Sequence, residues 1–135
     1  MIVADTNALA YLCIRGAKTA DAQAAARRDP DWITVPLWRD EFLNVLVLNV
    51  AARRLTTDQA LRAWSSAQGL MAGRESPVDA AATLELAVGA EITPYDAQFV
   101  LLAQRQGARL LTDDKVLLRK FPAIAISLAA FGAGA

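Results

Sequence analysis

The chain has 135 residues, which fits one domain with a sizeable core, and 55% of the residues are hydrophobic. The 14 Lys and Arg residues balance the 14 Asp and Glu residues, so any binding of nucleic acid has to come from a local arrangement of charge. The absence of His and the single Cys exclude the usual zinc sites and an internal disulfide, which leaves metals with oxygen ligands. No basic, apolar leader and no membrane-length apolar run is present, and with one cysteine this predicts a cytoplasmic protein with no membrane partner.

The first seven residues predict a buried strand that ends on polar residues. The run Ile2–Ala4 is apolar without alternation, as in a parallel sheet that is buried on both faces. Asp5 follows at the carboxyl end of this strand, where ligands bind in open α/β sheets. A helical stretch begins at once, and Thr6 or Asn7 can cap it. Asp5 is therefore either a helix-entry residue or a functional acid.

A long apolar helix follows two shorter elements. The pattern predicts a helix from Thr19 to Arg28 and a strand over Trp32–Val35. Pro36 suits the first position of the long helix, which we expect to run to Arg53. Apolar residues lie almost all round this helix, so we expect it in the core or in a subunit interface.

Two polar side chains interrupt the apolar helix on one face. Glu41 and Asn44 share this face with Leu48, at positions i, i+3 and i+7. Burying a carboxylate or an amide without a partner costs several kcal/mol, so both need partners. For Glu41, the alternatives to a functional role are an exposed position or an ion pair with Arg39 or Arg53.

The second half of the chain predicts more helices and two more strands. Thr93 and Asp96 are spaced as a helix cap and an acid three residues on, so Asp96 can be a capping residue or a functional one. Asp113 and Asp114 come directly after a predicted strand. We expect the small residues 128–135 to fray. The predicted helices cover 58–71, 76–88, 95–106 and 115–120, and the predicted strands cover 109–112 and 123–127.

The alternation of strands and helices predicts an α/β fold, with a short parallel sheet flanked by helices in one domain, residues 1–135. Right-handed crossovers place the carboxyl ends of all strands at the same edge of the sheet. Asp5 and the pair Asp113 and Asp114 should therefore meet, although they come from opposite ends of the chain.

The acids fall within four motifs whose order and spacing resemble the PIN domain family. Within that family the chain is most similar to VapC-type toxins of bacterial toxin–antitoxin pairs. Each motif alone is weak, but the four together cover essentially the whole chain in order. The motifs are Val3–Asn7, Val35–Leu46, Thr93–Ala103 and Leu110–Leu118.

The resemblance implies a PIN-like three-layer sandwich and an endoribonuclease that depends on Mg²⁺ or Mn²⁺. It also implies an RNA substrate and a small antitoxin as partner. Independently, the long helix from Pro36 to Arg53 has too much apolar surface for one small core, which predicts a homodimer. By motif position, the family's carboxylates fall on Asp5, Glu41, Asp96 and Asp114. Of these we assign Asp5, Asp96 and Asp114 to the metal, and Glu41 to orienting water or binding the metal through water. The accessory polar positions are Thr6 or Asn7, Asn44 and Thr112.

Elementary electrostatics supports an ion at such a site. Two carboxylates about 5 Å apart repel by about 3 kcal/mol at an effective dielectric constant near 20. A cluster of four persists only if some members are protonated or a divalent cation neutralises them.

Two alternatives remain open from the sequence. One is a PIN-like module that binds RNA or protein without cutting, although the acid set is intact. The other is a phosphoryl-transfer enzyme on another α/β fold, such as a receiver domain or a haloacid-dehalogenase-type phosphatase. The phosphatase pattern requires a second Asp two residues after the first, where this chain has Asn7.

Strand alternation also separates the neighbouring acids. Thr112 and Asp114 should point to one side and Asp113 to the other, if the extended backbone continues past the strand. Asp113 would then be a solvated turn residue or a first-turn acid of the next helix. A sharp turn after Thr112 would instead bring both acids to the site.

Overall fold

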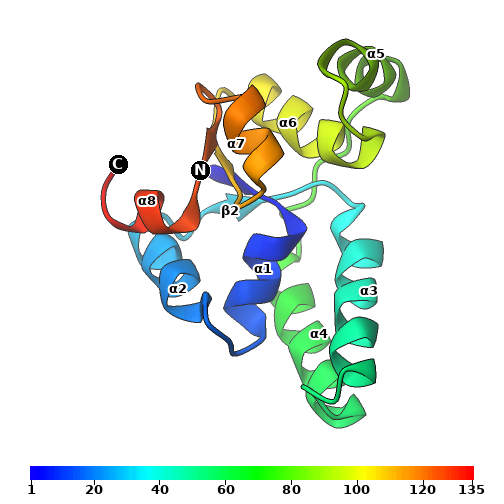
Figure 1. Ribbon diagram of the computed structural model, residues 1–135, viewed down its shortest axis with the longest axis vertical. Coiled ribbons are helices and arrows are strands. Elements are labelled where there is room, and N and C mark those ends of the chain that lie inside the picture. Colours follow the sequence, from blue (N-terminus) through cyan, green and yellow to red (C-terminus); the bar gives the residue numbers. More distant parts are fainter.

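Four short strands form one parallel sheet at the centre of the computed structural model, which describes residues 1–135 (Figure 1). The order across the sheet is β2-β1-β3-β4, so the first strand lies between strands from both halves of the chain. All three pairings are parallel, and the carboxyl ends therefore lie at one edge. The strands are β1 (Ile2–Ala4), β2 (Trp32–Ile33), β3 (Leu110–Leu111) and β4 (Ala125–Ile126).

Eight helices connect the strands and cover both faces of the sheet, as the α/β prediction requires. No helix is long and apolar enough to cross a lipid bilayer. In chain order the helices are α1 (Thr6–Cys13), α2 (Thr19–Arg28), α3 (Trp38–Ala51), α4 (Thr57–Met71), α5 (Ala80–Ala90), α6 (Pro94–Gln106), α7 (Lys115–Lys120) and α8 (Leu128–Gly132).

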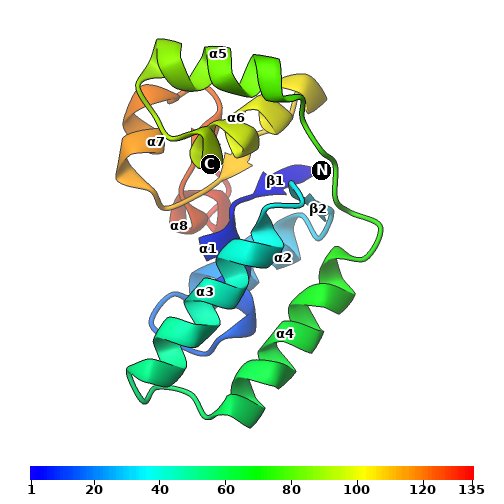
Figure 2. The ribbon, with the colours of Figure 1, turned by 90° about the vertical axis from the view of Figure 1, so that its right-hand side faces the viewer.

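The pleat of the sheet divides the core into two apolar clusters. Ile2 and Ala4 face a cluster formed with α1, α2, α3, α4 and α8, while Val3 faces a cluster formed with α6 and α7. In β3, Leu111 belongs to the first cluster and Leu110 to the second. Helix α5 packs outside α6 (Figure 2). The result is the expected three-layer arrangement.

Helices α3 and α4 form an arm that extends from the sheet (Figures 1 and 2). Trp38 stacks on Trp64 at 5.4 Å between ring centroids, and it meets Phe42 edge-on at 5.7 Å. These rings hold the arm together on its inner side. On the outer side of α3, Val47 is 64% exposed and Leu48 is 59% exposed, so the chain by itself buries only part of this apolar helix.

Several predicted boundaries differ from the structure, and in one case a side-chain cap overrides the local sequence pattern. Helix α5 begins at Ala80 rather than near Ser76, because the Asp79 side chain accepts the backbone N–H of Ala82. Helix α3 begins at Trp38, two residues after Pro36. The first strand, Ile2–Ala4, is as predicted, whereas each of the other three strands is shortened to two residues.

The expectation that residues 128–135 fray is wrong. Residues 128–132 form α8, which Ser127 caps and which packs on α2, and the backbone N–H groups of residues 133–135 bond back to α8. Leu128 and Phe131 are buried, and the Arg28 guanidinium donates to the carbonyl oxygen of Phe131 at 2.6 Å. The chain terminus is therefore tied to the first apolar cluster.

Candidate active site

A polar cavity of about 190 Å³ opens at the carboxyl edge of the sheet. Four elements supply its acids: the end of β1, the first turns of α3 and α6, and the segment between β3 and α7. No Lys or Arg side chain lines it. Its lining residues are Asp5, Thr6, Asn7, Glu41, Asn44, Val45, Asp96, Phe99 and Asp114.

Asp5 both caps a helix and lines the cavity. It is the N-cap of α1, a role expected for Thr6 or Asn7, and its Oδ1 accepts the backbone N–H of Ala8 at 2.8 Å. Its Oδ2 accepts the hydroxyl of Thr112 from the end of β3. Capping and lining the cavity are therefore not alternatives for this side chain.

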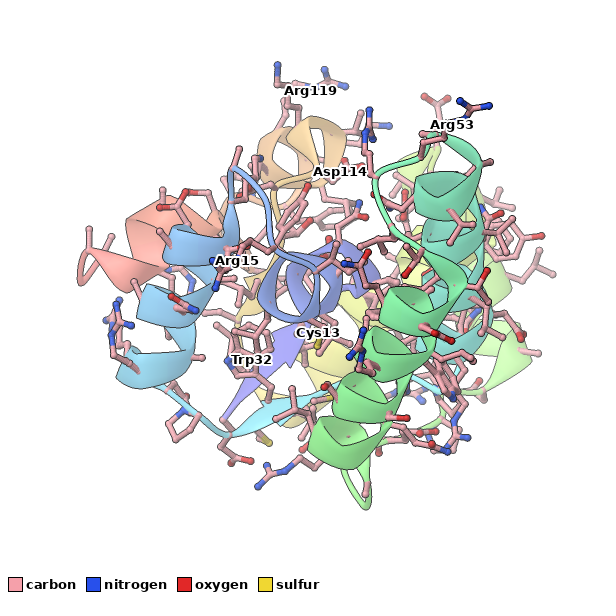
Figure 3. The ribbon with its side chains drawn as sticks, turned by 90° about the horizontal axis from the view of Figure 1, so that it is seen from below. Cys13, Arg15, Trp32, Arg53, Asp114 and Arg119 are labelled. Carbon is pink, nitrogen blue, oxygen red and sulfur yellow. The ribbon has the colours of Figure 1, made fainter.

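Thr112 links the two strand-end acids. Its side chain is fully buried, and its hydroxyl group donates to Asp5 and accepts the backbone N–H of Asp114 at 3.0 Å. Asp114 in turn caps α7, where its Oδ1 accepts the N–H of Leu117 at 2.9 Å. Figure 3 shows Asp114 at the start of α7. The backbone of Asp114 is extended, and its side chain lines the cavity as the alternation predicts.

Asp113 points away from the cavity, but it is not the solvated residue that the sequence predicts. Its Oδ2 accepts the ammonium group of Lys18 at 2.6 Å, and its Oδ1 accepts the N–H of Leu128 at 3.0 Å. It thereby ties the loop before α2 to the start of α8. The sharp turn that would bring both acids to the cavity does not occur.

Glu41 and Asp96 complete the acid set from the helices. The Thr6 hydroxyl donates to Oε1 of Glu41 at 2.7 Å, which leaves Oε2 without a hydrogen-bond partner. The ion pair considered for Glu41 with Arg39 does not form, because Arg39 pairs with Glu75. Asp96 lies in the first turn of α6, where the Thr93 side chain caps the helix by accepting the Asp96 N–H at 3.1 Å, and the Asp96 side chain lines the cavity.

Burial and mutual repulsion raise the pKa values of three of these acids. Burial raises the pKa of Asp5 to about 6, although the donors Thr112 and Ala8 oppose the shift. Burial also raises the pKa of Glu41, with a further contribution from the charge of Asp96. The pKa of Asp96 rises through burial and through the charge of Asp114. Burial and mutual repulsion therefore make it unfavourable for all of these carboxylates to be ionised at the same time.

The accessory positions fall into two groups. Asn7 and Asn44 are exposed at the cavity and offer amide oxygens to it. Thr112 is not part of the lining and acts through Asp5 and Asp114. No sequence pattern indicates the hydrogen bond between Thr6 and Glu41, because the partners come from different helices.

The donors of the cavity fit a hard divalent cation. They are carboxylate and amide oxygens, and the acids lack a cationic side chain that would balance them. No group of three His, Cys, Asp or Glu side chains is placed so that it could hold one ion. Magnesium usually takes one or two carboxylates directly and keeps several waters, so it does not require such a group.

Comparisons with known proteins agree with this architecture. The sequence is 31% identical over 129 residues to Ribonuclease VapC3 of Pyrobaculum aerophilum, covering 91% of this chain and 96% of the relative. The fold is similar to the crystal structure of PAE2754 from Pyrobaculum aerophilum, with a TM-score of 0.79 and 20% identity over 98% of this chain and 86% of that chain. The PIN domain profile matches residues 2–122, and the chain therefore belongs to the PIN domain family.

Proposed function

We propose that the protein is a Mg²⁺- or Mn²⁺-dependent endoribonuclease and the toxin of a cytoplasmic toxin–antitoxin pair. The observation that carries the proposal is the cavity itself, in which four carboxylates converge without a basic residue to balance them. Similarity to a protein named Ribonuclease VapC3 over nearly the full length of both chains supports RNA as the substrate.

The contacts of the four acids indicate a different role for Glu41 than for the other three. We assign Asp5, Asp96 and Asp114 to the metal, with one or two bound directly and the rest through water. Asp5 is fixed by two hydrogen bonds, so it can hold a constant position in the cavity. Bound Mg²⁺ or Mn²⁺ supplies an acidified water and offsets the charge of the phosphate group.

Glu41 is suited to a role beside the metal. Its Oε1 is held by Thr6, while its Oε2 remains free to orient or accept a proton from a water molecule. Burial raises the pKa of Glu41, which makes it a stronger base than an ordinary exposed carboxylate. Asn44 lies one turn further along α3 and can hold a phosphate oxygen through its amide group.

Metal dependence tests the proposed function. The purified protein should cleave single-stranded RNA in Mg²⁺ or Mn²⁺, and EDTA should stop the reaction because the oxygen donors need the ion to act. Gel analysis of a labelled oligonucleotide, with metal restored after EDTA as the control, measures this. Full cleavage in EDTA would refute the metal mechanism. Tight RNA binding without cleavage in any divalent ion would favour a non-catalytic binding module.

The outer surface of the α3–α4 arm suits a protein partner. A groove of about 560 Å³ runs between these helices, and eight of its nine lining residues are hydrophobic. We propose that a second copy of the chain covers it and that a small antitoxin also binds the protein in the cell. The side chains of Leu43, Val47 and Leu61 are 45%, 64% and 59% exposed, which is unfavourable in an isolated subunit.

A charged substitution tests the dimer. Light scattering at micromolar concentration should give twice the subunit mass for the parent, and Val47→Glu should shift the protein toward the monomer because it buries a charge in the groove. Val116→Glu is the matched control, since Val116 is also exposed but lies on α7. A monomeric parent, or equal effects of the two substitutions, would contradict the assignment.

A further inference from the structure

A second cavity lies directly beside the acidic one. Its volume is about 390 Å³, and it shares Asn7 and Val45 with the acidic cavity, so the two adjoin along these side chains. The rest of its lining comes from α1, the loop between α1 and α2, the first residue of α2, the end of α3 and the loop after α3. No Asp or Glu lines it.

The two cavities form one trough along a pair of neighbouring helices. On α1, Asn7 and Tyr11 lie one turn apart on the same face, and on α3, Val45 and Asn49 do the same. Both helices begin near the sheet and run in the same general direction away from it (Figure 1). The trough is therefore acidic where the helices begin and follows them toward their carboxyl ends. From Asn7 to Ile14 the rise along α1 is about 10 Å.

The far end of the trough is basic. Arg15, Lys18 and Arg54 line it, but Lys18 is already paired with Asp113 and lies 5.3 Å from the centre of the Tyr11 ring. Lys18 thus fixes the wall of the cavity. Arg15 and Arg54 take part in no ion pair and no side-chain hydrogen bond, so their charges are uncommitted.

We propose that this basic cavity is an RNA subsite, in which Arg15 and Arg54 bind a backbone phosphate of the strand whose scissile bond lies in the acidic cavity. The inference rests on the proposed ribonuclease function. The chain has no net charge, and a cavity of acids repels a polyanion, so substrate binding needs local cations beside it. The planar guanidinium group is well suited to phosphate because it can donate two parallel hydrogen bonds.

The size and the lining of the basic cavity fit a nucleotide better than a free anion. Successive phosphates of a stacked strand advance by about 3.4 Å along its axis, so a trough of about 10 Å corresponds to roughly two or three nucleotides from the cut. Ala10, Ile14 and Leu55 add apolar surface between the two ends of the cavity, which a base or ribose can cover. An inorganic phosphate would leave this surface in water.

Substitutions that remove the arginine charges test the subsite. The test variants are Arg15→Gln, Arg54→Gln and the double variant. The control is Arg53→Gln, which removes one positive charge next to Arg54 but from a residue that does not line the cavity. Figure 3 shows Arg53 extending outward at the end of α3, whereas Arg15 lies on the loop after α1. Cleavage of a single-stranded RNA oligonucleotide in Mg²⁺ is measured at several KCl concentrations, with circular dichroism as the check on folding.

Each cavity variant should raise KM about five- to tenfold, with kcat within about twofold. The slope of log KM against log[KCl] should fall by about 0.7 for each phosphate that the variant no longer binds. Arg53→Gln should match the parent.

The outcomes separate the subsite from the proposed function. If the parent cleaves RNA and the cavity variants behave like Arg53→Gln, the subsite is refuted while the ribonuclease function stands. Normal RNA cleavage by the cavity variants, combined with weaker binding of a polyglutamate peptide, would overturn the proposal in favour of an acidic protein segment. A parent that cleaves no RNA in Mg²⁺ or Mn²⁺ refutes the proposed function and the subsite with it.

Discussion

Replacing Asp5 by asparagine should reduce RNA cleavage at saturating Mg²⁺ on the order of a thousandfold or more, because it removes a fixed charge from the reacting centre. The fold should remain intact. Asparagine caps helices as well as aspartate does, and its side-chain oxygen can still accept the N–H of Ala8. Its amide group can donate to the Thr112 hydroxyl, so a hydrogen bond between these two side chains persists with the donor reversed.

The same substitution should change how stability depends on pH. The folded state raises the pKa of Asp5 from 3.8 to about 6, so the folded protein binds this proton more tightly than the unfolded chain. Without metal, the parent therefore loses up to about 3 kcal/mol of stability from this group as the pH rises from about 4 through 6. Asp5→Asn has no carboxyl group at this position, so its stability should not fall for this reason. The two proteins should be similarly stable near pH 4, and the variant should be more stable at pH 7.5.

Urea denaturation in EDTA at a series of pH values measures this difference. The difference between the two proteins in free energy of unfolding at each pH isolates the contribution of Asp5, since every other titrating group is present in both proteins. Near-parental cleavage by Asp5→Asn would reduce Asp5 to a helix cap. A stability difference that does not grow between pH 4 and 7.5 would show that its ionised form is not destabilised by burial.

Asp114→Asn should also reduce cleavage by about a hundredfold or more, whereas Asp113→Asn should stay within a few-fold of the parent. Asparagine at position 114 can still cap α7 through Leu117, so the reduction would come from the missing charge in the cavity. Asp113 faces Lys18 and the start of α8 instead. Its substitution should lower stability by about 0.5–1 kcal/mol, because Lys18 is half-exposed and solvent screens the pair.

Side-by-side assays on the same RNA, together with urea denaturation, separate these two acids. An activity defect found only in Asp113→Asn would refute the assignment. Equal defects in both variants would mean that Asp113 acts on the site through the loop that Lys18 holds.

The placement of the acids at the strand ends was predictable from the sequence because the connectivity of the strands determines it. An apolar run that ends on Asp5, and another that ends before Asp114, define two parallel strands whose carboxyl ends must meet. The structure confirms this edge and the alternation that turns Asp113 away. Capping by Thr56 and Thr93 also follows local rules that depend on a few neighbouring residues.

The remaining features depend on contacts between distant segments. Local composition predicted a frayed terminus, but Leu128 and Phe131 gain their burial from α2, which no local pattern reveals. The pair between Lys18 and Asp113 joins segments that are 95 residues apart. Arg15 and Arg54 likewise reach one cavity only because α1 and α3 are neighbours in space.

Binding of Mn²⁺ followed by electron paramagnetic resonance tests the central claim most directly, because it detects the ion without relying on catalysis. The parent and Asp113→Asn should bind Mn²⁺ with the same affinity, and Asp5→Asn and Asp114→Asn should bind it at least about tenfold more weakly. The metal concentration that gives half-maximal RNA cleavage should match the dissociation constant of the parent. Equal Mn²⁺ affinity in all four proteins would contradict a catalytic metal in the acidic cavity.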